Sequence, residues 1–68
     1  MSIIRRKIEV GRTMAVAVLN DNDGGRYTIS VEVPGLPARH DNDHSYDTEG
    51  QALIAATKLA ESLVMHLN

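Results

Sequence analysis

Two histidines and two aspartates lie within "RHDNDH", residues 39 to 44. Imidazoles at the spacing of His40 and His44 can bind one zinc ion when the segment forms a helical turn, and Asp41 and Asp43 add carboxylate ligands. However, the segment has no thiolate, and nothing in its sequence holds the imidazole rings in place. These four residues are therefore an alternative metal site. The favoured interpretation is a polar connection between two ordered elements, with no metal and no other cofactor.

A second acidic segment, "NDNDGG" at residues 20 to 25, is similar to the start of a calcium-binding loop. Counting from Asp21, Glu32 occupies the position at which an EF-hand requires a glutamate. Residues 27 to 33 alternate as a strand, however, so a hairpin turn is the favoured interpretation. In a simple meander the two "DND" triplets would lie at opposite ends of the sheet, about 20 Å apart.

Only serine and threonine are candidates for a nucleophile, because the chain has no cysteine. Ser45 follows His44, but adjacent residues of an extended segment point to opposite faces. The sequence has no Gly-x-Ser-x-Gly motif, no phosphate-binding loop and no dinucleotide-binding motif. The spacing of Ser30, Asp47 and His66 does not support a triad. We therefore expect a protein that is not an enzyme, and we name no catalytic residue.

The hydrophobic pattern predicts the elements that position these polar residues. Alternating apolar residues indicate strands over 3–10, 12–19 and 26–33. Both faces of 12–19 are apolar, which is typical of a central strand. Pro34 ends the third strand because proline cannot donate a hydrogen bond to the sheet. The segment "HSYDT", residues 44 to 48, can add a short edge strand.

An amphipathic helix follows, with Asp47 or Thr48 as its cap. Thr48 and Gln51 fit the capping-box pattern, in which each side chain satisfies the backbone N–H of the other residue. One apolar stripe with two flanking residues faces the sheet: Ala52, Ala56, Leu59, Ala60, Leu63 and Leu67, flanked by Leu53 and Val64. The helix should lie closest to the sheet near Ala52 and Ala56. The predicted fold class is α+β, a three- or four-stranded antiparallel sheet followed by one C-terminal packed helix.

The chain has 68 residues, so we expect a single domain over residues 1–68 with a small core. It has no cysteine, phenylalanine or tryptophan, so neither a disulfide nor a large apolar ring stabilises that core. Self-association would bury further apolar area, and we expect a homodimer. The cations that follow Ile3 and Ile4 leave no apolar region of a signal peptide, and no apolar run approaches the roughly 18 residues of a membrane span. These patterns predict a cytoplasmic protein without a membrane segment.

Four residues of the predicted helix lie opposite its apolar stripe: Ile54, Lys58, Glu61 and Met65. Single apolar residues on a protein surface are common. Here, however, two of them share the solvent-facing side of a helix in a chain with a thin core, which favours a binding surface. These four residues are the candidate site for a protein partner or for a second copy of the chain.

The net charge of −2 is unevenly distributed, because residues 1–12 carry +3 and residues 13–68 carry −5. The basic residues are an alternative site for nucleic acid or a small ligand: Arg5, Arg6, Lys7 and Arg12. Cations on a strand more often form its solvated face or protect its edge, so nucleic-acid binding is not the favoured interpretation. Acidic residues cluster before the helix, where they can steer a basic partner: Asp41, Asp43, Asp47 and Glu49.

Residues 27–67 resemble the partial RNase H-like domain of HicB-type antitoxins. In that family a strand leads into a Pro-x-Leu-Pro segment, a short strand with a threonine and an Ala-rich helix. Here "VPGLP" and "DTEGQALIAATKLAESL" stand in those places. The family has a tighter connection where this chain has "ARHDNDHSYD", and it usually adds a DNA-binding segment where this chain ends at Asn68. The resemblance implies a protein that blocks a small toxin ribonuclease by binding, without DNA autoregulation, and it implies no catalytic residues.

The favoured function is thus a small, non-catalytic protein-interaction module, such as an antitoxin-like or inhibitory binder of a partner protein. The alternative is a nucleic-acid or small-ligand binder that uses the basic N-terminal strand. The dependence of binding on salt concentration distinguishes the two functions. Binding to phosphate weakens steeply as salt is added, whereas binding through an apolar helix interface does not.

Overall fold

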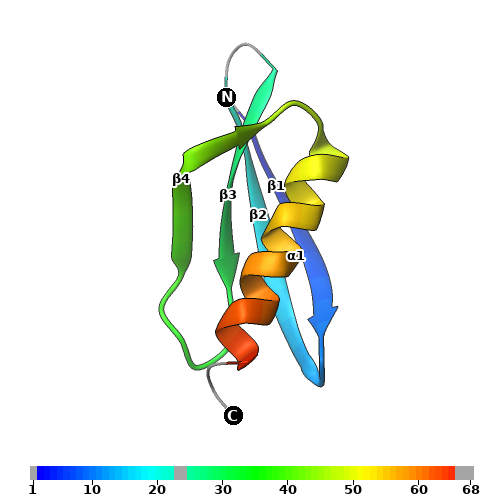
Figure 1. The fold of residues 1–68 in the computed structure, drawn as a ribbon, viewed down its shortest axis with the longest axis vertical. Helices are drawn as coiled ribbons and strands as arrows, with labels where there is room; N and C mark the ends of the chain where they lie inside the picture. Colours follow the sequence, from blue (N-terminus) through cyan, green and yellow to red (C-terminus); the bar gives the residue numbers. More distant parts are fainter. Residues whose placement is uncertain (1, 23–24, 66–68) are drawn as a thin grey trace.

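The computed structural model describes residues 2–22 and 25–65 and shows one helix packed across a four-stranded sheet (Figure 1). The elements are β1 (Ser2–Val10), β2 (Thr13–Asn22), β3 (Arg26–Glu32), β4 (Arg39–Tyr46) and α1 (Glu49–Met65). All strand pairs are antiparallel, and their order in the sheet is the order in the sequence. The predicted α+β fold is confirmed, with four strands before the helix.

The first three strands form the regular part of the sheet. Pairing of β1 with β2 runs without a break from Ser2 opposite Asp21 to Val10 opposite Thr13. Gly11 turns the chain between them with a φ of 62°, which glycine adopts without strain. β2 lies between β1 and β3, as its two apolar faces predict.

The hairpin of β2 and β3 confirms the hairpin interpretation of residues 20 to 25. β2 continues to Asn22, three residues further than the sequence predicts, and β3 begins at Arg26 as predicted and ends at Glu32. Residues 23 and 24 lie outside the described residues. Asp21 and Glu32, the first and last ligands of the calcium-loop alternative, lie near opposite ends of this hairpin, because Glu32 is opposite Val16.

β4 corrects the interpretation of "RHDNDH" as an irregular connection. Pro34 and Gly35 form a tight turn, in which the Leu36 N–H donates to the Val33 carbonyl (3.0 Å) and Gly35 has a φ of 86°. The chain then runs back beside β3 as an edge strand. An edge strand has one solvent-exposed side, so it does not require the apolar alternation on which the sequence prediction relied.

The core lies between α1 and one face of the sheet. The helix contributes three fully buried alanines, and the sheet contributes branched apolar side chains: Ala52, Ala56 and Ala60 from α1, and Leu19, Ile29 and Val31 from the strands. Small side chains at these buried positions let a helix approach a sheet closely. α1 packs mainly against β2 and β3 and only slightly against β4 (Figure 1). Leu67, the last member of the predicted stripe, lies outside the described residues.

The opposite face of the sheet, called the open face here, carries no helix of the described residues. It presents Ile3 and Met14, which are 60% and 53% exposed. Val18 also points to this face, yet it is only 7% exposed. Arg5 of β1 lies opposite Val18 and forms an ion pair with Glu32 of β3, which lies opposite Val16, so the two side chains reach across β2 beside Val18. Within the described residues, no helix is long and apolar enough to cross a membrane.

Candidate functional site

The side of α1 that points away from the sheet carries the four candidate residues of the sequence analysis. Ile54 is 60% exposed, Met65 is 73% exposed, and Lys58 and Glu61 are also exposed. We call these four residues the outer face of α1. Their exposure follows from the helical period, because the alanine stripe fixes the opposite side of α1 against the sheet.

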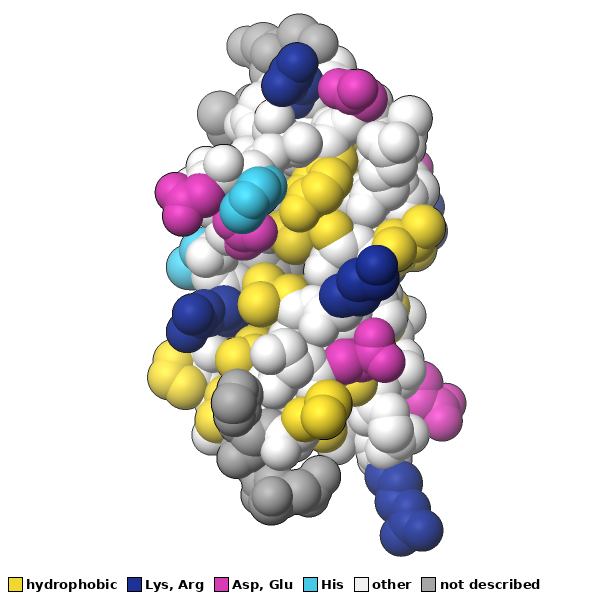
Figure 2. Space-filling view, viewed as in Figure 1, with side chains coloured by type: hydrophobic (Ala, Val, Ile, Leu, Met, Phe, Trp, Pro, Cys, Tyr) yellow, Lys and Arg dark blue, Asp and Glu magenta, His cyan; other side chains and the backbone are white. Residues whose placement is uncertain are grey.

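Two shallow grooves meet on the outer face at Lys58. The first is lined by Lys58, Glu61, Ser62 and Met65. The second lies between α1 and β4 and is lined by Tyr46, Gln51, Ile54, Ala55 and Lys58. Figure 2 shows hydrophobic side chains gathered in the strip between β4 and α1, with charged side chains on either side of it. Weak packing between α1 and β4 leaves this strip open.

Sequence reasoning missed four lining residues of the two grooves: Tyr46, Gln51, Ala55 and Ser62. The helical period carries a signal for three of them, because they lie beside the candidate residues on the same side of α1. Tyr46 had no such signal. It comes from the end of β4, where it lies opposite Tyr27, and that pairing requires the fold.

The two charges of the outer face differ from those of Arg5 and Arg6 in having no ion-pair partner among the described residues. Arg5 pairs with Glu32, and Arg6 pairs with Glu49 (2.9 Å). Within residues 2–22 and 25–65, neither Lys58 nor Glu61 forms an ion pair. Both charges are therefore available to a binding partner.

The structure does not gather the four basic N-terminal residues into one patch. Arg5 and Lys7 point to the open face, whereas Arg6 points to the face that α1 covers and contacts Glu49 at the start of the helix. Arg12 lies in the turn after β1. Two of the four cations are thus already paired with carboxylates, and the four lie on both sides of the sheet.

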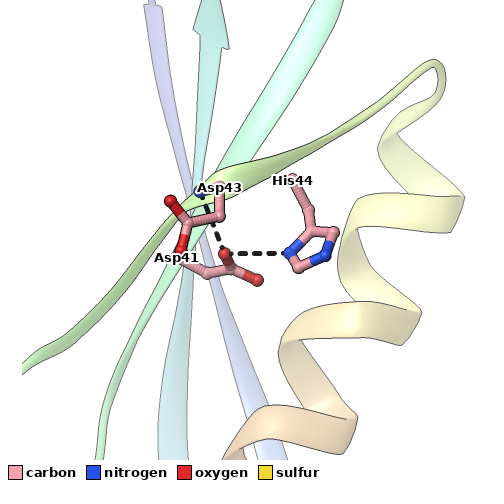
Figure 3. Close-up of polar contacts among 3 residues, drawn as sticks. All are labelled: Asp41, Asp43 and His44. Atoms are coloured by element: carbon pink, nitrogen blue, oxygen red, sulfur yellow. Dashed lines mark hydrogen bonds and ion pairs between the residues drawn. The ribbon is translucent and has the colours of Figure 1, made fainter.

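The histidine and aspartate cluster is also divided between the two faces. The Asp41 carboxylate accepts a hydrogen bond from the Asp43 N–H (3.2 Å) and contacts Nδ1 of His44 (3.2 Å), as Figure 3 shows. His40 lies opposite Ser30 and points to the other side of the strand from Asp41. Among the described residues, no group of three or more histidine and acidic side chains is placed to hold a metal ion.

One further expectation about the acidic residues is wrong. The first residues of the two "DND" triplets lie toward the same end of the sheet, because Asp21 is opposite Tyr27 and Asp41 is opposite Ile29, only two residues further along β3. The error arises because β4 returns along β3. Of the acidic residues before the helix, Glu49 is paired with Arg6.

Ser45, the residue after His44, forms a hydrogen bond between strands. The Ser45 hydroxyl accepts a hydrogen bond from the Arg26 guanidinium (3.0 Å), which ties β4 to β3. Ser45 and His44 therefore have different partners, as their adjacent positions in an extended segment predict. His66 lies outside the described residues.

No family model, curated protein or solved structure matches this chain.

Proposed function

We propose that this chain is a small, non-catalytic protein-interaction module that binds a partner protein through the outer face of α1. The observation that carries the proposal is the exposure of Ile54 and Met65, at 60% and 73%, beside two grooves that adjoin the same helix. Exposed apolar residues that cluster near grooves are typical of protein interfaces.

Burial of these two side chains supplies a useful driving force. Full burial of an isoleucine or methionine side chain stabilises by about 1.5–3 kcal/mol, so covering the exposed part of each contributes roughly 1–2 kcal/mol. Lys58 and Glu61, which lie between them, add orientation, because complementary charges favour one register of docking over others. A partner with apolar residues at both ends of a charged centre would fit this surface.

An antitoxin-like, inhibitory binder is the form of this function that the resemblance of residues 27–67 to HicB-type antitoxins implies. Asp41 and Asp43, on the strand that borders the second groove, favour a partner that places basic side chains beside that groove. The proposal assigns no residue to catalysis.

Affinity capture from the source cell, followed by mass spectrometry, tests the proposal. The disrupting variant is Ile54→Lys with Met65→Lys. The matched control is Ile3→Lys with Met14→Lys, which places the same charges at exposed apolar residues of the same types on the open face. We expect the wild type and the control to retain the same partner and the disrupting variant to lose it.

Thermal melting followed by circular dichroism checks that the wild type, the disrupting variant and the control are all folded, because loss of the partner is informative only for a folded variant. Retention of the partner by a folded outer-face variant, or its loss only in the open-face control, would contradict the proposal.

A further inference from the structure

Both edges of the sheet oppose self-association by strand pairing. The free edge is regular at β1, but Arg5, Arg6 and Lys7 occupy the centre of that strand. Two copies of β1 paired antiparallel about their centres would set these cations opposite one another, and like charges in that position are destabilising. At β4 the register is irregular, because the six residues from Asp41 to Tyr46 oppose only the three from Ile29 to Tyr27. An irregular edge is a poor template for a further strand.

The residues of the outer face have a symmetric spacing. From Ile54 to Lys58 is four residues, from Lys58 to Glu61 is three, and from Glu61 to Met65 is four. The order is apolar, positive, negative, apolar. When this sequence is placed against a reversed copy of itself, each lysine therefore meets a glutamate, and each isoleucine meets a methionine.

We infer that the occupant of the outer face is a second copy of this chain, with the two α1 helices packed antiparallel about a two-fold axis midway between Lys58 and Glu61. This inference rests on the proposed function and names its partner. In this arrangement Lys58 of each copy pairs with Glu61 of the other, twice in one interface. In a parallel arrangement like charges would meet at both positions, so the charges select the antiparallel one.

The intramolecular alternative for these charges is weak. Lys58 precedes Glu61 by three residues on α1, and a helix favours the reverse order, with the acidic residue nearer its N-terminus. Within the described residues the structure forms no such pair. Pairing of Lys58 and Glu61 between two copies is therefore more favourable than pairing within one helix.

The grooves complement the same arrangement. Met65 of one copy lies beside Ile54 of the other, where the second groove offers Tyr46 and Ala55. A flexible methionine fills an irregular groove well, and its sulfur interacts favourably with an aromatic ring. The small side chains of Ala55 and Ser62, which flank the outer face, allow the two helices to approach closely.

The contact between the two α1 helices is short, so we expect the dimer to be weak. Residues 54 to 65 cover about 16 Å of helix at 1.5 Å per residue. Such a contact falls at the small end of protein interfaces, which is typical of weak association. We therefore expect a dimer with a dissociation constant on the order of 100 micromolar, so sedimentation must extend to about millimolar chain concentration to populate it fully.

Sedimentation equilibrium of charge variants tests the pairing. Lys58→Glu gives two negative charges on each copy, and Glu61→Lys gives two positive charges, so each variant alone should dissociate about tenfold more readily than the wild type. A mixture of the two variants should dimerise as tightly as the wild type. The double variant K58E with E61K, which exchanges the two charges, should also restore the wild-type dissociation constant.

The control replaces Lys7, an exposed cation of the open face, with Glu, and it should leave the dissociation constant unchanged. A monomer at every concentration would overturn the inference, and so would a dimer that is unaffected by the single charge variants. If the chain is monomeric but still captures a different protein through Ile54 and Met65, the inference fails while the proposed function stands. If neither self-association nor capture depends on these residues, both fail.

Discussion

The hydroxyl of Thr48 fixes the first turn of α1, and through it the position of the outer face. It accepts a hydrogen bond from the Gln51 N–H (3.1 Å), and the Thr48 carbonyl accepts one from the Ala52 N–H (3.0 Å). This contact is the half of the predicted capping box that the structure shows. Because the first backbone N–H groups of a helix have no partner inside it, a side-chain acceptor there stabilises the whole element.

Replacing Thr48 with alanine should therefore lower the free energy of unfolding by about 1 kcal/mol. Serine, which keeps the hydroxyl, should lose much less. Urea denaturation followed by circular dichroism measures both variants. Equal midpoints for the wild type and the alanine variant would show that the cap contributes nothing to stability.

Local contacts such as this cap can be predicted from the sequence, whereas long-range polar contacts cannot. Thr48 and Gln51 are three residues apart, so the helix alone brings them together. Arg5 and Glu32 lie 27 residues apart and meet only because β1 and β3 flank β2. For the same reason, Arg6 appeared in the sequence as part of a basic cluster but in the fold is the partner of Glu49.

At the scale of elements, α1 was the easiest to predict and β4 the hardest. The alternation of β3 and the period of α1 are strong signals because each element buries one face. β4 buries little, so its polar sequence gave no periodic signal, and only the pairing with β3 defines it. The candidate site was found in part for the same reason: the α1 side followed from the helical period, but Tyr46 on β4 did not.

The closeness of α1 to the sheet leads to a prediction about its central alanine. Ala56 has no exposed surface. Leucine at this position must push the helix away from the sheet or adopt a strained rotamer, so Ala56→Leu should lower the free energy of unfolding by roughly 1–3 kcal/mol. Ser62→Leu, which adds a similar volume at an exposed position of the same helix, is the control and should change it little. Comparable thermal melts for both variants would contradict this packing.

The whole molecule has two faces of different character. On one, α1 covers a thin core of alanine and branched side chains. On the other, the open face carries charged side chains, and Arg5 and Glu32 cover part of its apolar surface. The cations of the N-terminal strand are divided between these faces, and Arg5 and Arg6 are paired with carboxylates, so the described part of the chain presents no continuous basic surface to a phosphate backbone.

We therefore expect no binding of nucleic acid, even where salt is too low to screen it. Fluorescence anisotropy with labelled single-stranded RNA and with duplex DNA measures this directly. If binding occurs, weakens steeply with salt and disappears when Arg5, Arg6 and Lys7 are changed to alanine, the alternative function replaces the one proposed here.

The central claim is that this protein binds other proteins through the outer face of α1, and methyl NMR tests it with internal controls. The isoleucine and methionine methyl groups of the protein are labelled. One series of spectra is recorded from millimolar to low micromolar chain concentration, and a second is recorded in an unlabelled extract of the source cell. Ile54 and Met65 report on the outer face, whereas Ile3 and Met14 report on exposed positions of the open face. We predict that the Ile54 and Met65 signals shift or broaden while those of Ile3 and Met14 stay unchanged. Changes confined to Ile3 and Met14, or no change at any of the four in either series, would contradict the claim.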